Sequence, residues 1–245
     1  MPRFAERVAG WRSSLADLER WLLPGACLLC EAPVAEREGD ALVCGLCRSR
    51  WRSIPGPLCD RCGQPGFAGL ECRICSGWPP HLRRVRSAVW LEEAARRAVH
   101  RLKYDGWWRV ADAMVRTMGA LEPLTGRVCL IPVPLGAARA RERGYNQSER
   151  IATALGALTG APVRCDVLHR VRETRTQTAL APEARQANLA GAFACAGAAG
   201  LTAVLVDDVF TTGATLGSAA AALAAAGAET VDGITFARAM EPMAG

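Results

Sequence analysis

Residues 204–216 read VLVDDVFTTGATL, and this stretch decides the fold. Three apolar β-forming residues open it and predict a buried strand, which ends at the paired carboxylates Asp207 and Asp208. The small polar residues 211–215 predict a turn, and the alanine-rich run 216–226 predicts a helix. A strand that leads through a glycine-containing turn into a helix N-terminus is typical of a phosphate site, because free backbone N–H groups converge there on an anion.

The side chains of this stretch suit a phosphorylated sugar. The threonine hydroxyls donate hydrogen bonds and the glycine lets the backbone approach closely. The two aspartates repel a phosphate and suit a diol, or a cation that bridges the diol to further phosphates. We expect both carboxylates to face water at the carboxyl edge of the sheet. An ordinary buried strand with a capped helix is the alternative. The predicted phosphate ligands are Thr211, Thr212, Gly213, Ala214 and Thr215.

Strands and helices alternate along the rest of the chain, which predicts a parallel sheet with crossover helices. Ligands of such sheets bind beyond the carboxyl ends of the strands. The expected strands are 87–90, 127–133, 163–168, 202–206 and 230–236, and the expected helices are 92–103, 108–121, 146–159 and 213–226.

Two further loops fall at the same predicted edge. The first contains Pro134 and Leu135 and leads to Arg139, whose guanidinium can neutralise a pyrophosphate. A solvated, basic start of a helix is the alternative for this loop. The second loop, residues 169–190, is long and polar and contains Arg175, which predicts either a disordered segment or a lid over the site.

Lys103 is the one lysine among 30 lysine and arginine residues. A compact ammonium is not interchangeable with a planar guanidinium at a point-charge contact with phosphate. We therefore interpret Lys103 as a phosphate ligand, and a surface lysine is the alternative.

Eight of the 11 cysteines form four C-x-x-C pairs. Each pair supplies two thiolates from one tight turn, so two pairs complete a tetrahedral zinc site. Joining neighbouring pairs gives two consecutive zinc ribbons, whereas an interleaved arrangement stays open. A disulfide framework is disfavoured because no secretory signal is present. The predicted ligands of two structural zinc ions are Cys27, Cys30, Cys44, Cys47, Cys59, Cys62, Cys72 and Cys75.

Length and composition predict a soluble cytoplasmic protein of three parts. The 245 residues are 50% hydrophobic, without the run of about 20 apolar residues that a membrane span needs. Residues 1–24 predict an amphipathic helix, 25–80 a double zinc ribbon, and 84–245 an α/β domain. The formal net charge of +6 permits nucleic-acid binding without indicating it.

The stretch 204–216 resembles the phosphoribosyl-pyrophosphate (PRPP) signature of type I phosphoribosyltransferases. With the other motifs, the chain after Pro24 resembles the ComF family, bacterial proteins associated with competence for natural transformation. The motifs that carry this resemblance are the four C-x-x-C pairs, residues 102–106, residues 143–147, Thr176 and Gln177 with Arg185 and Asn188, and the PRPP signature.

This resemblance implies a type I phosphoribosyltransferase-like parallel sheet flanked by helices and preceded by a small zinc-ribbon module. It implies that PRPP binds with Mg²⁺, with Asp207 and Asp208 on the ribose hydroxyls, 211–215 on the 5′-phosphate and the loop after Val133 on the pyrophosphate. Lys103 would reach the phosphates from the pocket edge, and Asp207, Asp208 and Arg175 are the catalytic candidates.

The implied reaction is that of a pentosyltransferase, a glycosyltransferase that moves phosphoribose to an acceptor not yet known. Purine-salvage relatives usually carry an aspartate at the position of Thr211, where it handles the proton of the base. Threonine is a poor general base at neutral pH, so purine salvage is not expected. The second hypothesis is a non-catalytic factor that senses PRPP or handles nucleic acid, with single-stranded DNA or the DNA-uptake machinery as its partner.

Overall fold

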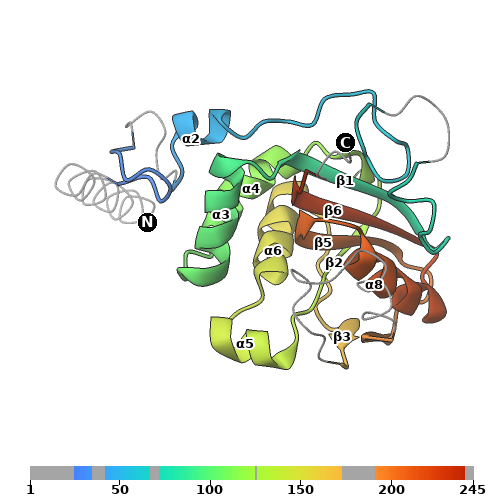
Figure 1. The fold of residues 1–245 in the computed structure, drawn as a ribbon. Coiled ribbons are helices and arrows are strands. Elements are labelled where there is room, and N and C mark those ends of the chain that lie inside the picture. Colours follow the sequence, from blue (N-terminus) through green and yellow to red (C-terminus); the bar gives the residue numbers. More distant parts are fainter. Residues whose placement is uncertain (1–24, 35–41, 67–71, 125, 173–190, 241–245) are drawn as a thin grey trace, which may run out of the picture.

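The computed structural model describes residues 25–34, 42–66, 72–124, 126–172 and 191–240. Its body is a four-stranded sheet in the order β1-β6-β5-β2, and every neighbouring pair in it is parallel (Figure 1). The strands are β1 (Leu82–Trp90), β2 (Cys129–Pro132), β5 (Thr202–Phe210) and β6 (Thr230–Arg238). The predicted parallel α/β sheet is therefore confirmed.

Helices cover both faces of this sheet. Alternate residues of β5 point to opposite faces, so Val204 and Val206 belong to one hydrophobic cluster and Ala203 and Leu205 to another. The first cluster is completed by α3 (Glu93–Tyr104), α4 (Val110–Met118) and α6 (Gln147–Thr159), and the second by α8 (Ala214–Ala225). Figure 1 shows α3, α4 and α6 gathered together, with α8 apart from them.

The predicted strand 163–168 is wrong as part of the main sheet. Only Val163 forms an isolated parallel bridge, to Leu130. Arg164 and Asp166 follow it as an exposed ion pair, which a parallel strand buried on both faces would not accommodate. The chain instead forms β3 (Leu168–Arg170), which pairs antiparallel with β4 (Phe193–Cys195) in a separate two-stranded sheet.

Strand β5 runs four residues past its predicted end at 206. Its last residues, Val209 and Phe210, pair in register with Ala237 and Arg238 of β6. The paired carboxylates consequently lie within a strand rather than in the loop after it. Smaller elements that the sequence pattern did not predict are α2 (Gly45–Ser49) and η2 (Glu122–Leu124). A further helix, α5 (Ala137–Arg143), lies where a basic start of a helix was the alternative.

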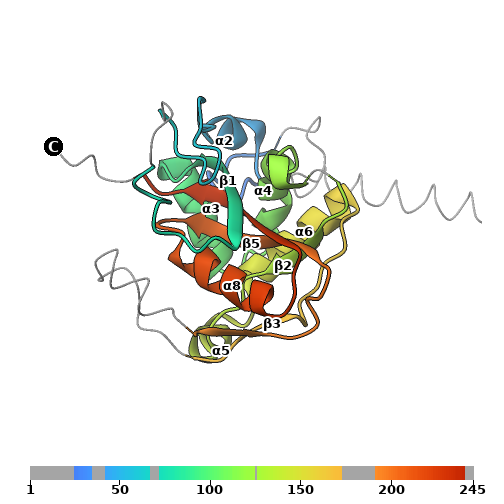
Figure 2. The ribbon, with the colours of Figure 1, turned by 90° about the vertical axis from the view of Figure 1, so that its right-hand side faces the viewer.

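The cysteine-rich segment lies along the free edge of β1, as both ribbon views show (Figures 1 and 2). Val85 N–H donates to the carbonyl of Arg61 over 2.7 Å, and Trp90 N–H donates to that of Arg52 over 2.9 Å. These contacts satisfy backbone groups that an edge strand would otherwise expose. The segment is thus built onto the sheet.

Two predictions lie partly or wholly outside the described residues. The amphipathic helix expected in 1–24 is one, and most of the lid expected in 169–190 is the other. The division of the chain into three domains stays a prediction. Within the described ranges, no helix is both long enough and apolar enough to cross a membrane.

Candidate functional site

The two carboxylates of β5 are held by side chains from the helices packed beside the strand. Asp208 is only 3% exposed; the ammonium of Lys103 forms an ion pair with it, and Gln147 Nε2 donates to its Oδ1 over 3.1 Å. Asp207 is half-buried and accepts a hydrogen bond of 2.8 Å from Ser148 Oγ. The expectation that both carboxylates face water is therefore wrong, because the protein compensates their charge internally.

The order of elements explains how these partners come together. Lys103 lies in the last turn of α3, while Gln147 and Ser148 open α6. Asn146 caps α6 by accepting from Ser148 N–H over 3.1 Å, and its Nδ2 donates to the carbonyl of Val133 over 3.1 Å. The start of α6 is thereby fixed to the end of β2, beside the carboxylates.

The two carboxyl groups differ in acidity. Burial and the adjacent charge of Asp208 raise the pKa of Asp207 to about 7. Burial would raise the pKa of Asp208 too, but Lys103 and the hydrogen bonds to its carboxylate bring it below its ordinary value. Asp208 therefore stays ionised, and Asp207 adds a second negative charge to the pair near neutral pH. A diol or a cation would favour the doubly ionised form.

The ammonium of Lys103 is directed at Asp208 in this structure. Burial would lower the pKa of Lys103, but the Asp208 carboxylate raises it above its ordinary value, so the lysine stays charged. Its role as a phosphate ligand stays a prediction. Ser148 was missed by sequence reasoning, because one serine in a helix start carries no distinguishing signal.

The predicted phosphate turn follows β5 directly. Residues 211–213 form the turn, and α8 begins at Ala214 with Gly213 as its N-cap at φ +80°, a conformation that favours glycine. Thr212 Oγ1 accepts from Ala214 N–H over 3.4 Å, and Thr211 is exposed. The turn therefore has the predicted arrangement of a helix N-terminus beside two carboxylates.

The loop predicted to hold pyrophosphate lies next to the carboxylates. Val133 N–H donates to the carbonyl of Val206 over 3.0 Å, so the chain leaves β2 beside the residue that precedes Asp207. Pro134 and Leu135 are half-buried in this loop, and Arg139 follows in α5. Arg175, the remaining catalytic candidate, lies outside the described residues.

The structure also contains a cavity of about 620 Å³ at the opposite edge of the sheet, near Arg127, Pro162 and Thr202. Arg127 is the one charged residue in its lining, which is otherwise small or apolar. This cavity therefore lacks the convergent polar groups that a substrate site requires.

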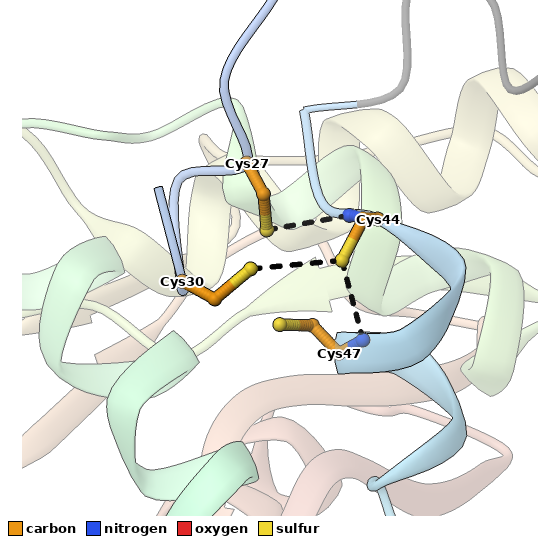
Figure 3. Close-up of side chains that lie close together, drawn as sticks. All are labelled: Cys27, Cys30, Cys44 and Cys47. Atoms are coloured by element: carbon orange, nitrogen blue, oxygen red, sulfur yellow. Dashed lines mark hydrogen bonds between the residues drawn. The ribbon is translucent and has the colours of Figure 1, made fainter. Parts of the chain in front are cut away.

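The first four cysteines converge on one point. The side chains of Cys27, Cys30, Cys44 and Cys47 are directed toward one another in Figure 3, and their sulfur atoms all lie within 4.8 Å. The Cys30 and Cys44 sulfurs are 3.8 Å apart. Cys44 N–H and Cys47 N–H each approach a sulfur at 3.4 Å, the kind of contact that stabilises a metal-bound thiolate (Figure 3).

The second group consists of Cys59, Cys62, Cys72 and Cys75, again with all sulfurs within 4.8 Å. Two of its sulfur pairs are 3.5 and 3.7 Å apart. A regular tetrahedron with Zn–S bonds of about 2.3 Å has S–S edges of about 3.8 Å, so both groups fit zinc. Neighbouring C-x-x-C pairs are joined in each group, which settles the pairing as two consecutive sites rather than an interleaved one.

Fold and sites together define a class of protein: a double zinc ribbon fixed to a parallel α/β body. Comparison with known proteins supports this description. A family model described as "Double zinc ribbon domain" matches residues 18–76. The chain is 33% identical to "DNA utilization protein YhgH" of Salmonella typhi over 220 residues, covering 85% of this chain and 95% of the relative.

Two further relatives carry competence in their names. Identity is 28% to "Competence protein ComFC" of Bacillus subtilis, over 86% of this chain and 94% of the relative. It is also 28% to "Competence protein F" of Haemophilus influenzae, over 80% of this chain and 90% of the relative. The chain belongs to the ComF family of competence and DNA-utilization proteins.

Proposed function

We propose that the protein is a cytoplasmic phosphoribosyltransferase that binds PRPP with Mg²⁺ at the carboxyl edge of the sheet. The observation that carries this proposal is one continuous strand, turn and helix. This segment brings the carboxylates of Asp207 and Asp208, of which Asp207 titrates near neutral pH, close to the N-terminus of α8, whose N-cap is Gly213. A diol and a phosphate of one sugar would match these two features at neighbouring positions.

The chain's own groups would bind and orient the substrate. Asp207 and Asp208 would accept hydrogen bonds from the ribose hydroxyls, and the first turn of α8 would donate backbone N–H groups to the 5′-phosphate. The loop at Pro134 and Leu135 would hold the pyrophosphate. Asp207 and Asp208 are also the residues that would hold Mg²⁺, which when bound would neutralise negative charge on the substrate.

In the proposed reaction, the bond between ribose C1 and the pyrophosphate oxygen breaks, and pyrophosphate departs with the bonding electrons. An acceptor nucleophile then forms the new bond at C1. The carboxylates beneath the ribose would stabilise positive charge that develops on the ring. Because Thr211 is not a general base, the acceptor must lose its proton to solvent or to pyrophosphate.

Calorimetric titration with PRPP and Mg²⁺ tests the binding step. Replacing Asp207 by Asn should weaken PRPP binding at least about tenfold, or about 1.4 kcal/mol. Asp232→Asn is the control for removing a carboxylate elsewhere in the sheet: Asp232 is 3% exposed, is ion-paired to Arg83, and lies on β6 beside Val204 rather than at the carboxyl edge. Equal affinities in parent and Asp207→Asn would refute the site. Release of pyrophosphate with a panel of bases, amines and nucleic acids tests catalysis.

The second candidate function is the handling of single-stranded DNA, and a specific surface favours it. Tyr104, Trp107 and Trp108 are 64%, 47% and 43% exposed at the junction of α3 and α4. Arg143 lies 5.2 Å from the Tyr104 ring, and Arg150 lies 4.8 Å from that of Trp108. Exposed rings interleaved with guanidinium groups suit stacked bases and backbone phosphates.

This candidate is tested by fluorescence anisotropy with a labelled single-stranded oligonucleotide. We expect replacement of Trp107 and Trp108 by Ala to weaken binding by about 1–3 kcal/mol for each stacked base. The buried aromatic residue Trp90 offers the control variant Trp90→Phe. Oligonucleotide binding that does not depend on the exposed tryptophans would refute this surface.

A further inference from the structure

The second zinc ribbon reaches into the phosphate turn through one residue. Trp78 lies three positions after Cys75, and its indole Nε1–H donates to the carbonyl oxygen of Thr212 over 3.1 Å. The same ring lies against Gly213, where the Cβ of any other residue would overlap its atoms. The close approach and the positive φ therefore both require glycine at this position.

Contacts with the cysteine module hold Trp78 in this position. Arg61, which lies between Cys59 and Cys62, donates to the carbonyls of Cys75 at 3.1 Å and Trp78 at 3.2 Å. Its guanidinium carbon is 5.8 Å from the centre of the Trp78 ring. The C-x-x-C turn of Cys59 and Cys62 supplies two zinc ligands, and through Arg61 it also fixes the backbone of Trp78.

The end of β5 is tied to the same ribbon from a second direction. Phe210, the residue before the turn, stands 5.8 Å from the Trp78 ring. The buried guanidinium of Arg238 lies 4.2 Å over Phe210 and donates to the carbonyl of Cys62 over 2.8 Å. Both ends of the connection from β5 to α8 therefore contact Trp78, and Phe210 is also linked to Cys62 through Arg238.

The hydrogen bond to Thr212 has a geometric consequence for anion binding. In a trans peptide the C=O and N–H bonds point in opposite directions. With the Thr212 carbonyl turned toward Trp78, the N–H of Gly213 must point away from the ribbon. It is then available to the anion expected at the N-terminus of α8.

We propose that Trp78 is a positioning residue for the phosphate turn, and that it makes PRPP binding depend on the second zinc site. This inference rests on the proposed function. It assigns the second ribbon a task beyond its own folding: it sets the orientation of the Thr212–Gly213 peptide before the substrate arrives. The first ribbon has no such contact with the turn among the described residues.

Trp78→Phe tests the inference because it keeps an aromatic ring but removes the indole donor and part of the ring system that lies against Gly213. Its matched control is Trp51→Phe, a buried tryptophan of the first ribbon that packs on Phe236 with ring centroids 4.9 Å apart. Within the described part of the chain, the Trp51 indole N–H has no acceptor, so this substitution loses no hydrogen bond.

Each protein is titrated calorimetrically with PRPP and, separately, with pyrophosphate, both in the presence of Mg²⁺. We expect Trp78→Phe to weaken PRPP binding about 3- to 10-fold, the range for one lost hydrogen bond. Pyrophosphate carries no 5′-phosphate, so its affinity should change less than about twofold. Trp51→Phe should leave both affinities unchanged, and both variants should retain two zinc ions.

The outcomes separate the two proposals. A parent protein that binds neither ligand refutes the proposed function and this inference with it. If the parent binds PRPP, then unchanged PRPP affinity in Trp78→Phe refutes the inference alone, and so does an equal loss for PRPP and pyrophosphate.

A second pair of variants tests the link to zinc. Cys72→Ser removes a ligand of the second site and should reproduce the selective loss of PRPP affinity. Cys44→Ser removes a ligand of the first site and should not. Equal effects of the two substitutions on PRPP binding would overturn the dependence on the second site.

Discussion

Replacing Asp208 by Asn should destabilise the protein far more than the same change at Asp207. Asp208 is 3% exposed and paired with Lys103, whose side chain is 22% exposed. Asn at this position leaves a largely buried ammonium without its counter-charge. Breaking a buried ion pair by removing one partner costs about 3 kcal/mol or more. For a chain of this length, that loss lowers the melting temperature by about 6–12 °C.

Asp207→Asn is the internal control for this prediction. The pKa of Asp207 is raised to about 7, so the parent already holds this carboxyl partly protonated at neutral pH. The amide oxygen of Asn can accept the hydrogen bond that Ser148 donates. We expect a loss below about 1 kcal/mol for this substitution.

Urea denaturation followed by circular dichroism measures both variants. A further variant, Lys103→Met combined with Asp208→Asn, removes both charges and should recover most of the stability lost by Asp208→Asn alone. Similar losses of stability in Asp207→Asn and Asp208→Asn would refute the prediction that Asp208 matters more for stability than Asp207. A double variant no more stable than Asp208→Asn would show that Lys103 is not the partner whose charge decides the cost.

Three further predictions concern Asp207, the zinc sites and Lys103. The pKa of Asp207 is higher in the folded protein than in the unfolded chain. The stability of the parent, compared with that of Asp207→Asn, should therefore fall as pH rises from about 4 to 7. Denaturation midpoints of the two proteins that change in parallel across this range would contradict the prediction. Elemental analysis should find two zinc ions per chain, and Cys62→Ser should reduce this to one, whereas four disulfides after anaerobic purification would exclude both sites. Lys103→Met should weaken PRPP binding by about 1–3 kcal/mol in calorimetry, and unchanged affinity would leave the lysine as a partner of Asp208 alone.

The parallel sheet and the zinc sites could be predicted because their signals are local. The C-x-x-C spacing brings two thiolates into one turn whatever surrounds it, and apolar runs such as 202–206 identify buried strands. The end of β5 could not be predicted, because its pairing with β6 decides it. Asp207 and Asp208 look like loop residues until Lys103, 105 positions before Asp208, is placed beside them.

The contacts of Trp78 show the same limit more sharply. Nothing in the residues 78–80 distinguishes a tryptophan that closes a zinc ribbon from one that contacts a turn 134 positions later. The unusual signal is on the other partner, since Gly213 has no room for a side chain. Long-range contacts of this kind depend on how the ribbon is seated on β1, which local patterns do not specify.

The position of the zinc ribbons also affects where nucleic acid would contact the protein. Each tetrathiolate zinc centre carries a net charge of about −2, so metal binding makes the cysteine module less attractive to phosphates. Arg61 and Arg238 each donate to the backbone carbonyl of a cysteine in the second group. The exposed rings of Tyr104 and Trp108 instead adjoin arginines of α5 and α6. Lys103, the residue before Tyr104, holds Asp208. If single-stranded DNA is the partner, its bases would therefore stack within reach of the proposed PRPP site, while Trp78 of the second ribbon would contact the phosphate turn.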